Sequence, residues 1–157
     1  MRNVTLCFLV RENEICLAMK KRRFGAGKWN GVGGKVEEGE FIKEAAVREL
    51  REEIGVDASV DDLDNVGNLH FYFNEHPDWN QYMHIFFIKR WTGEPKESEE
   101  MAPRWHKQNA LPYNDMGVDD IHWLPQVLAG KRVEGEFYFD GDGEKLDKFQ
   151  VRELATS

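Results

Sequence analysis

The sequence predicts an α+β fold in which one mixed sheet packs between helices. Strand-like segments outnumber helical ones, most of them neighbour one another along the chain, and two segments have clear helical periodicity. The chain has 157 residues, with 41% apolar and 32% charged residues, which is ordinary for one globular domain with a full core. We therefore expect residues 1–157 to form a single domain.

The first third of the chain is expected to hold two paired strands and a loop. Apolar residues dominate residues 4–10 and 15–19, and the polar residues 12–14 between them are typical of a turn. Residues 20–29 are basic and interrupted by glycine, which indicates a loop. Residues 30–35 are expected to return as a short strand or loop that leads into a helix.

The rest of the chain is expected to be mostly strand, with a second helix. Aromatic-rich strands are predicted at residues 66–74 and 82–91, followed by an acidic loop at 95–101 and a strand edge at 104–106. An irregular connection begins at residue 111. Either aspartate at 119–120 is expected to begin a helix that runs to about Leu128 and is ended by Gly130. Residues 133–140 and 146–154 are predicted to form a hairpin around a glycine-rich turn at 141–143.

The first predicted helix follows a glycine loop and carries an unusual cluster of acids. Its apolar residues Ala45, Ala46, Leu50 and Ile54 recur at helical spacing, and Gly55 suits the left-handed turn that ends a helix. On its flank stand three glutamates, Glu49, Glu52 and Glu53, which a helix brings within about 6 Å of one another. Such repulsion becomes affinity when a divalent cation binds, because carboxylates are preferred ligands of Mg²⁺, Mn²⁺ and Ca²⁺.

Residues 34–56 match a family signature at every specified position. Gly34, five residues, Glu40, seven residues and then Arg48-Glu49-Leu50-Arg51-Glu52-Glu53-Ile54-Gly55-Val56 have the spacing of the Nudix box. The chain therefore resembles the Nudix hydrolases, and residues 20–34 and 97–120 resemble the MutT-like type that removes oxidised purine nucleotides. The alternative is an ordinary acidic surface helix. The resemblance implies an α/β/α sandwich.

The resemblance also implies the metal-binding and catalytic residues. Glu49 and Glu53 would bind Mg²⁺, or alternatively Mn²⁺, with Glu52 as a further ligand or as a base that holds the attacking water, and Glu53 is also expected to be catalytic. The Gly33 carbonyl would join the metal shell, and Glu100 would approach from the acidic loop as a ligand or base. Arg48 would orient a carboxylate, although a surface salt bridge explains it equally well. Glu40 complements the helix dipole at least as plausibly as it acts in catalysis. On sequence alone, Glu100 reads as a solvated loop residue.

A purine pocket is implied at other positions. The polar readers of the base would be Asn30, Asp119 and Asp120, and Lys20 in the basic run would contact the substrate. The walls of this pocket would be Phe24, Phe71, Met101 and Trp123. Each residue has an ordinary alternative: Phe71 and Trp123 can be core residues, and either aspartate can cap the second helix.

The expected activity is metal-dependent hydrolysis of a nucleoside triphosphate, such as an 8-oxo-dGTP-like nucleotide, to a monophosphate and pyrophosphate. The alternatives are a Nudix hydrolase of a dinucleotide, nucleotide sugar or ADP-ribose, and a non-catalytic nucleotide-binding module. One departure bears on the substrate. The enzymes of the resembled type carry tryptophan and proline where this chain has Gly117 and Val118, so we expect the pocket to be open on one side.

Composition restricts partners and location. The net charge of −8 argues against a general nucleic-acid binder, and we expect no stable nucleic-acid complex. The sequence lacks an apolar run long enough to span a membrane, and the apolar stretch at its start is too short for a secretory signal. Cys7 and Cys16 lie in strand-like apolar contexts, where a reduced thiol is the default. We expect a cytoplasmic protein that is a monomer or a small homo-oligomer.

Overall fold

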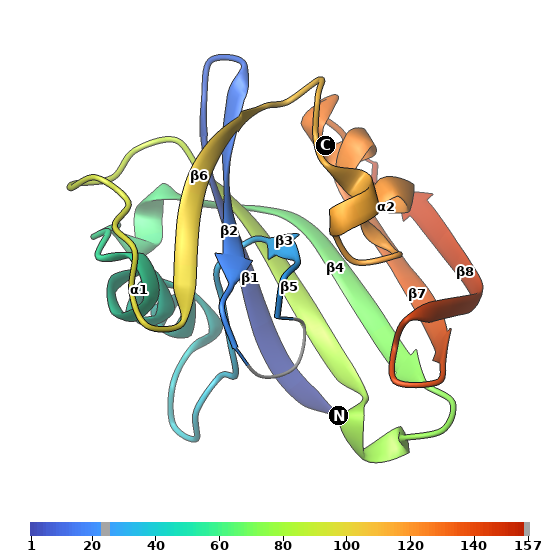
Figure 1. The fold of residues 1–157 in the computed structure, drawn as a ribbon. Helices are drawn as coiled ribbons and strands as arrows, with labels where there is room; N and C mark the ends of the chain where they lie inside the picture. Colours follow the sequence, from blue (N-terminus) through green and yellow to red (C-terminus); the bar gives the residue numbers. More distant parts are fainter. Residues whose placement is uncertain (23–25, 156–157) are drawn as a thin grey trace.

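The computed structural model describes residues 1–22 and 26–155, and in this part of the chain two α-helices lie against one mixed sheet (Figure 1). The predicted α+β class and the sandwich architecture are confirmed. The helices are α1 (Ile42–Ile54) and α2 (Asp120–Leu128). The strands are β1 (Arg2–Arg11), β2 (Glu14–Lys20), β3 (Trp29–Asn30), β4 (Leu63–Phe73), β5 (Gln81–Ile88), β6 (Met101–Lys107), β7 (Val133–Asp140) and β8 (Lys145–Glu153).

The strand order brings the ends of the chain into one sheet. The strands run β3-β2-β1-β5-β4-β7-β8, and β6 pairs with the other edge of β2. Two pairs are parallel, β1 with β5 and β4 with β7, and the other pairs are antiparallel. β1 and β2 pair at only two positions beside their turn, Val10 with Ile15 and Arg11 with Glu14. Beyond these positions the two strands diverge and leave a wedge between them.

The glycine loop fills this wedge. β3 pairs with β2, and the residues after it pair with β1 by backbone hydrogen bonds. The Thr5 N–H donates to the Gly34 carbonyl at 2.9 Å, and the amide of Val32 exchanges hydrogen bonds with that of Cys7 at 2.9 and 2.7 Å. The loop therefore enters α1 from a position fixed along β1.

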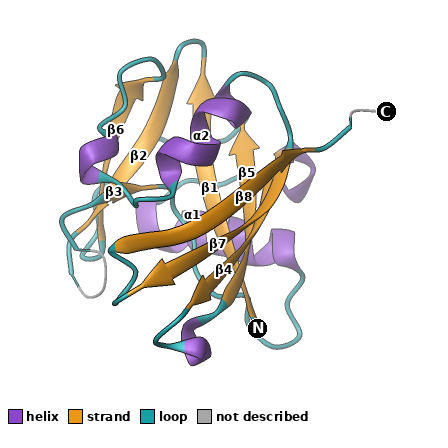
Figure 2. Cartoon of the chain, turned by 90° about the vertical axis from the view of Figure 1, so that its right-hand side faces the viewer, coloured by secondary structure: helices purple, strands orange, loops and turns teal. Residues whose placement is uncertain are grey.

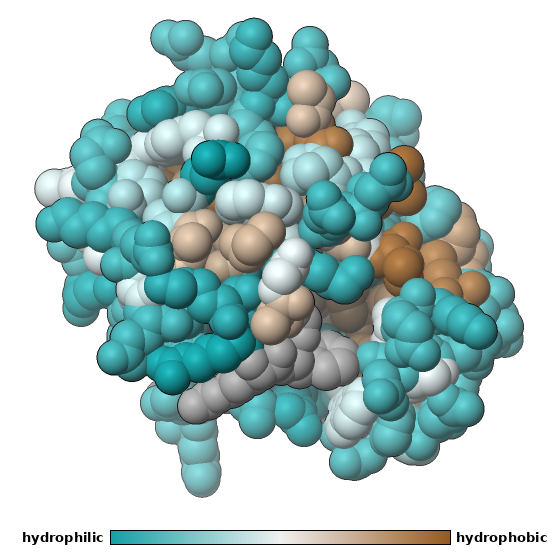
Figure 3. Space-filling view, viewed as in Figure 1, coloured by the Kyte–Doolittle hydropathy of each residue, from teal (hydrophilic) through white to brown (hydrophobic). Residues whose placement is uncertain are grey.

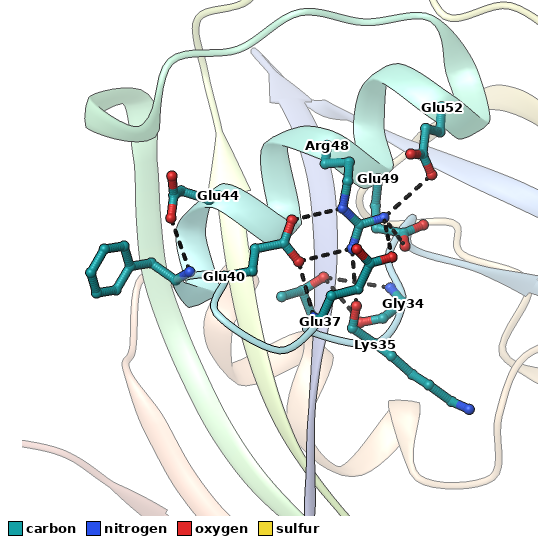
Figure 4. Close-up of polar contacts among 10 residues, drawn as sticks. Gly34, Lys35, Glu37, Glu40, Glu44, Arg48, Glu49 and Glu52 are labelled. Carbon is teal, nitrogen blue, oxygen red and sulfur yellow. Dashed lines mark hydrogen bonds and ion pairs between the residues drawn. The ribbon is translucent and has the colours of Figure 1, made fainter.

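α1 forms because its sequence satisfies both ends and one apolar face. The Glu44 carboxylate accepts a hydrogen bond from the Phe41 N–H at 2.9 Å, which satisfies one free donor of the first turn (Figure 4). Gly55 has φ 68° and ends the helix in the left-handed conformation. The predicted apolar positions of α1 are all buried against one face of the sheet, at Ala45, Ala46, Leu50 and Ile54.

α2 covers the opposite face of the sheet, as Figures 1 and 2 show from two directions. Its inward residues Trp123, Leu124 and Val127 are buried in a cluster with Phe8 and Phe137. Helix and bounds agree with the prediction. Each helix thus closes one layer of core, and the sheet separates the two layers.

The strand bounds differ from the prediction by a few residues, and β6 is extended most. The sequence predicts a strand edge at 104–106, preceded by a loop that includes Met101, whereas β6 spans Met101–Lys107. The predicted loop was wrong at Met101 because β6 pairs with β2 along its entire length, from Met101 opposite Lys20 to Lys107 opposite Glu14. This pairing is non-local, and Pro103 hides it in the sequence.

The surface is mainly hydrophilic on the face of Figure 1, with hydrophobic patches near α2 and β8 (Figure 3). Ile121 and Phe149 are among the large apolar side chains that stay exposed. No helix within the described residues is long and apolar enough to cross a membrane. Both cysteines are buried free thiols, and burial raises the pKa of Cys16 to about 11 and that of Cys7 further.

Candidate active site

Arg48 gathers the acidic side chains of α1 and of the loop before it (Figure 4). Its guanidinium forms a fork on Glu40, with Nε to Oε2 at 2.7 Å and Nη2 to Oε1 at 3.0 Å. It also donates to Glu49 Oε1 at 2.9 Å and to Glu52 Oε2 at 3.3 Å. The hydrogen bond from Arg48 lowers the pKa of Glu40. Arg48 thus forms hydrogen bonds with three carboxylates, and it binds Glu40 through two of its nitrogens, Nε and Nη2.

Glu53 is the least satisfied acid of this group. Its Oε2 is buried and, among the described residues, lacks a hydrogen-bond partner. Burial, the neighbouring Glu49 carboxyl and the charge of Glu100 together raise the pKa of Glu53 to about 8, against the opposing charge of Lys20. An acid in this position holds a proton unless a cation replaces it.

Gly33 is required by close packing, and Gly34 lies against an acid of α1. A Cβ on Gly33 would lie 1.8 Å from the Thr5 carbonyl oxygen, which no side chain tolerates. A Cβ on Gly34 would lie 2.6 Å from Oε1 of Glu49. The loop backbone therefore lies directly against a predicted metal-binding carboxylate, and Gly33 is the position where only glycine leaves room.

Glu100 reaches this region from a distant loop. Arg22 Nε lies 3.2 Å from Glu100 Oε1, and the Lys21 N–H donates to the Glu100 carbonyl at 2.9 Å. The charge of Glu100 is felt at Glu53, because it contributes to the raised pKa of that residue. The structure thus brings Glu100 toward the acids of α1, as the resemblance implies.

These acids do not already converge as a finished metal site. In residues 1–22 and 26–155, no group of three or more acidic, histidine or cysteine side chains has the arrangement of a metal centre. Glu49 and Glu52 are instead engaged by Arg48. The chemistry of the donor set nevertheless fits a hard cation, since the unpartnered Glu53 oxygen and its neighbours are all carboxylates.

A cavity of about 560 Å³ adjoins the glycine loop. It is lined by residues from β1, β3, β4, the loop before α2 and the β7–β8 hairpin. Most of the predicted substrate-binding residues line it, together with Gly33: Lys20, Asn30, Phe71, Met101 and Asp119. Phe24 lies outside the described residues. The sequence-predicted set is therefore largely brought to one place.

Asp119 and Asp120 form a buried carboxyl pair at the start of α2. The Trp123 indole N–H donates to Asp119 Oδ2 at 2.8 Å, and the Gly117 N–H donates to Asp120 Oδ2 at 2.9 Å. Burial raises the pKa of both acids; the charge of Asp119 and a hydrogen bond between the two carboxyls raise that of Asp120 further. The upward shift of the pKa is larger at Asp120, where burial and the neighbouring Asp119 carboxyl act together.

Two predicted pocket residues lie behind the cavity surface. Trp123 is 0% exposed, and its ring packs 6.3 Å from that of Phe8 in the core. It does not line the cavity, but its indole N–H donates the hydrogen bond to Asp119 described above. Asp120 is likewise absent from the lining and contacts the Gly117 backbone. Their roles as wall and base reader remain predictions.

Sequence reasoning missed several aromatic walls. Phe73 and Phe139 line the cavity beside Phe71, and their rings stack 5.1 Å apart. A signal for Phe73 was present, because it stands two residues after Phe71 and so shares a strand face. Phe139 has no such local signal; it arrives through the parallel pairing of β7 with β4, opposite Phe73.

With this geometry in place, comparison with known proteins assigns the family. The family model of the NUDIX domain matches residues 1–127. The chain belongs to the Nudix family. Its matched region contains the whole Nudix box, the glycine loop and Glu100.

Two curated Nudix relatives match nearly end to end. An oxidized purine nucleoside triphosphate hydrolase from Danio rerio is 46% identical over 151 residues, covering 94% of this chain and 95% of the relative. A protein of the same name from Mus musculus is 42% identical over 153 residues, covering 98% and 96%. The crystal structure of a MutT protein from Bacillus halodurans matches with a TM-score of 0.81 and 26% identity, over 96% of this chain and 97% of the other.

Proposed function

We propose that this Nudix protein hydrolyses oxidised purine nucleoside triphosphates to the monophosphate and pyrophosphate. The observation that carries the proposal is one cavity that brings the predicted base-binding residues to the glycine loop before α1. Gly33 and Gly34 of the glycine loop line it, together with Asn30, Phe71 and Asp119. The two curated relatives bear the name of this activity.

Mg²⁺, with Mn²⁺ as an alternative, is the proposed metal. Glu49, Glu52 and Glu53 would hold it, with Glu100 and the Gly33 carbonyl as further candidates. When bound, such a cation neutralises phosphate charge and lowers the pKa of a bound water. The protein's own part is to fix these oxygens: Arg48 holds Glu49, and Gly34 lies against it. The buried, unpartnered Glu53 oxygen supports this proposal.

The base would be read by the carboxyl pair and Asn30. A carboxyl group that retains its proton can donate to a purine acceptor, while its ionised neighbour accepts from a donor. Asp119 lines the cavity. The Trp123 indole N–H donates a hydrogen bond to it, and a hydrogen bond with the Asp120 carboxyl affects its pKa. A site built this way rejects a base that leaves its buried polar groups unpaired.

A substrate panel with Mg²⁺ tests the proposal. Oxidised and normal dGTP and dATP, a dinucleoside polyphosphate, a nucleotide sugar and ADP-ribose are compared by kcat/KM and by product identity. We expect pyrophosphate plus a monophosphate, with an oxidised purine nucleoside triphosphate as the best substrate. Preference for ADP-ribose, a nucleotide sugar or a dinucleotide contradicts the proposed substrate. Turnover of none of them, with binding retained, indicates a non-catalytic module.

A further inference from the structure

A second cavity, of about 570 Å³, lies at the opposite end of the sheet from the glycine loop. It is bounded by the β1–β2 turn, the start of β4, the end of β5 and the residues after α2, near the top of Figure 1. No described residue lines both cavities. It also lies outside every set of residues assigned above to metal, phosphate or base.

The floor of this cavity is apolar. Val10, Val66, Phe87 and Val127 line it and are only 3–7% exposed, and Leu128 beside them is half-buried. All of them belong to or pack on the core cluster beneath α2. The core therefore reaches the surface here as a hollow, where an apolar group gains by displacing water.

The rim carries an excess of positive charge. Four cationic side chains line it, Arg11, Lys89, Lys131 and Arg132, against two acidic ones, Glu12 and Asp64. This local surplus of two occurs on a chain with a net charge of −8. Within the described residues, Lys89 is exposed and has no ion pair. Lys89 is therefore the rim cation that is left to attract an anion.

Hydrogen bonds hold both sides of the rim in place. Gly130 has φ 93°, so the chain turns back after α2 and brings Lys131 and Arg132 to the cavity. Arg132 is fixed to β4 through the Asn65 carbonyl and through Asp64 at 2.8 Å. On the other side, Gln108 Nε2 donates to the Glu14 carbonyl at 3.1 Å. The hollow is thus formed before any ligand arrives.

We propose that this cavity is a second binding site, for a small organic anion with an aromatic or branched apolar body. The body rests on the valine floor, and the carboxylate or sulfonate meets Lys89 at the rim. The floor offers no polar group to a nucleobase edge, and three of the four rim cations already have acidic neighbours within 4 Å, which disfavours a polyphosphate. This inference is independent of the function proposed above.

The test uses 8-anilinonaphthalene-1-sulfonate, an aromatic sulfonate that fluoresces in apolar sites. We expect one probe molecule to bind per chain and to stay bound when dGMP saturates the substrate cavity. Lys89→Glu and Leu128→Gln should each weaken binding at least about fivefold. The control Lys43→Glu makes the same charge change on the exposed surface of α1 and should leave binding unchanged.

A second measurement locates the probe without substitutions. In methyl NMR, the signals of Val10, Val66 and Val127 should shift on titration, while that of Val4, which lines the substrate cavity, should not. Displacement of the probe by dGMP, a shift at Val4 alone, or equal binding to Lys89→Glu and wild type would each overturn the proposal.

Discussion

The Asp119–Asp120 pair and the acids of α1 each place a carboxyl group beside another acid, but the two groups of acids differ in how their oxygens are satisfied. At Asp119 and Asp120 the oxygens accept hydrogen bonds from an indole and a backbone amide, and burial raises the pKa of both acids. On α1, Glu53 keeps a buried oxygen without a partner in the described chain. The first cluster is complete by itself, whereas the second is complete only when something positive binds.

This difference separates the two tasks proposed for this protein, metal binding and base recognition. A carboxyl pair with its own donors keeps a fixed pattern of donor and acceptor, which suits the recognition of a base. A cluster with an unpartnered oxygen and a raised pKa has affinity left for a cation. Substitutions in the two clusters should therefore have different signatures, and four predictions test whether they do.

The largest effect is expected at α1. Glu53→Gln should lower kcat by at least about 100-fold, because it removes a charge that stabilises the metal and the reacting water. Measurement of kcat at saturating Mg²⁺, beside a circular-dichroism melt, checks that the fold is retained. Asp119→Asn is the matched control and should keep far more of its kcat. A Glu53→Gln enzyme with most of its activity would remove the basis for the metal site.

The carboxyl pair should control discrimination instead. Asp119→Asn or Asp120→Asn should reduce the preference for oxidised over normal dGTP about tenfold, because one member of the pair can no longer exchange donor for acceptor. The ratio of the two kcat/KM values is the readout. If both variants only melt earlier and discriminate as before, the pair is structural, as simple helix capping would predict.

The contributions of the two groups of acids to stability should also differ when stability is measured against pH with and without Mg²⁺. Without metal, the folded protein keeps the Glu53 proton up to about pH 8, while the unfolded chain loses it near pH 4.5. The resulting stability is complete below pH 4.5 and is lost as the pH rises to about 8. The raised pKa values of Asp119 and Asp120 act in the same direction.

Millimolar Mg²⁺ should cancel only the part of this pH-dependent loss of stability that comes from the acids of α1. We expect it to add on the order of 1 kcal/mol to the free energy of unfolding near pH 8 and less near pH 5.5. Urea titrations with and without Mg²⁺ measure this difference. The Mg²⁺ increment should persist in Asp120→Asn and vanish in Glu53→Gln; identical increments in the two variants would contradict the assignment.

The smallest effect is expected at Gly117. A Cβ there would lie 2.9 Å from Asp119 Oδ1 and 3.2 Å from Asp120 Oδ2, so Gly117→Ala must displace the carboxyl pair slightly. We expect a loss of about 1 kcal/mol in stability and a small loss of discrimination, with Val118→Ala as the control. Gly117→Trp should lower KM for purine triphosphates only if the loop moves away from Asp119. An unchanged melt for Gly117→Ala would show that the contact is already relaxed.

Much of the α1 site could be predicted because its information is local. The spacing of Arg48, Glu49, Glu52 and Glu53 on one helix, and the glycines before it, stand within a short stretch of sequence. The bounds of the helix follow from its apolar face and from Gly55. What the stretch does not contain is which acid stays unpartnered, since this depends on how Arg48 divides its donors among Glu40, Glu49 and Glu52.

The base-binding side was less predictable because it is assembled from distant strands. Phe139 joins Phe71 only through the pairing of β7 with β4. We expected Trp123 to form a wall of the substrate cavity, and helical spacing alone does not show that this residue packs into the core. Its burial under Asp119 is a tertiary result. The second cavity has no sequence signal at all, since its floor and rim come from separated segments.

The attachment of the glycine loop to β1 has a consequence for motion. The amides of Thr5, Cys7, Val32 and Val36 all donate across this seam, and they do so where no side chain at Gly33 would fit. A seam of this kind opens only when the sheet itself comes apart, so we expect its amides to exchange with deuterium at the slow rate of global unfolding. Nucleotide must then enter and leave the substrate cavity past other residues that line it, such as those of the hairpin at Asp142–Glu144.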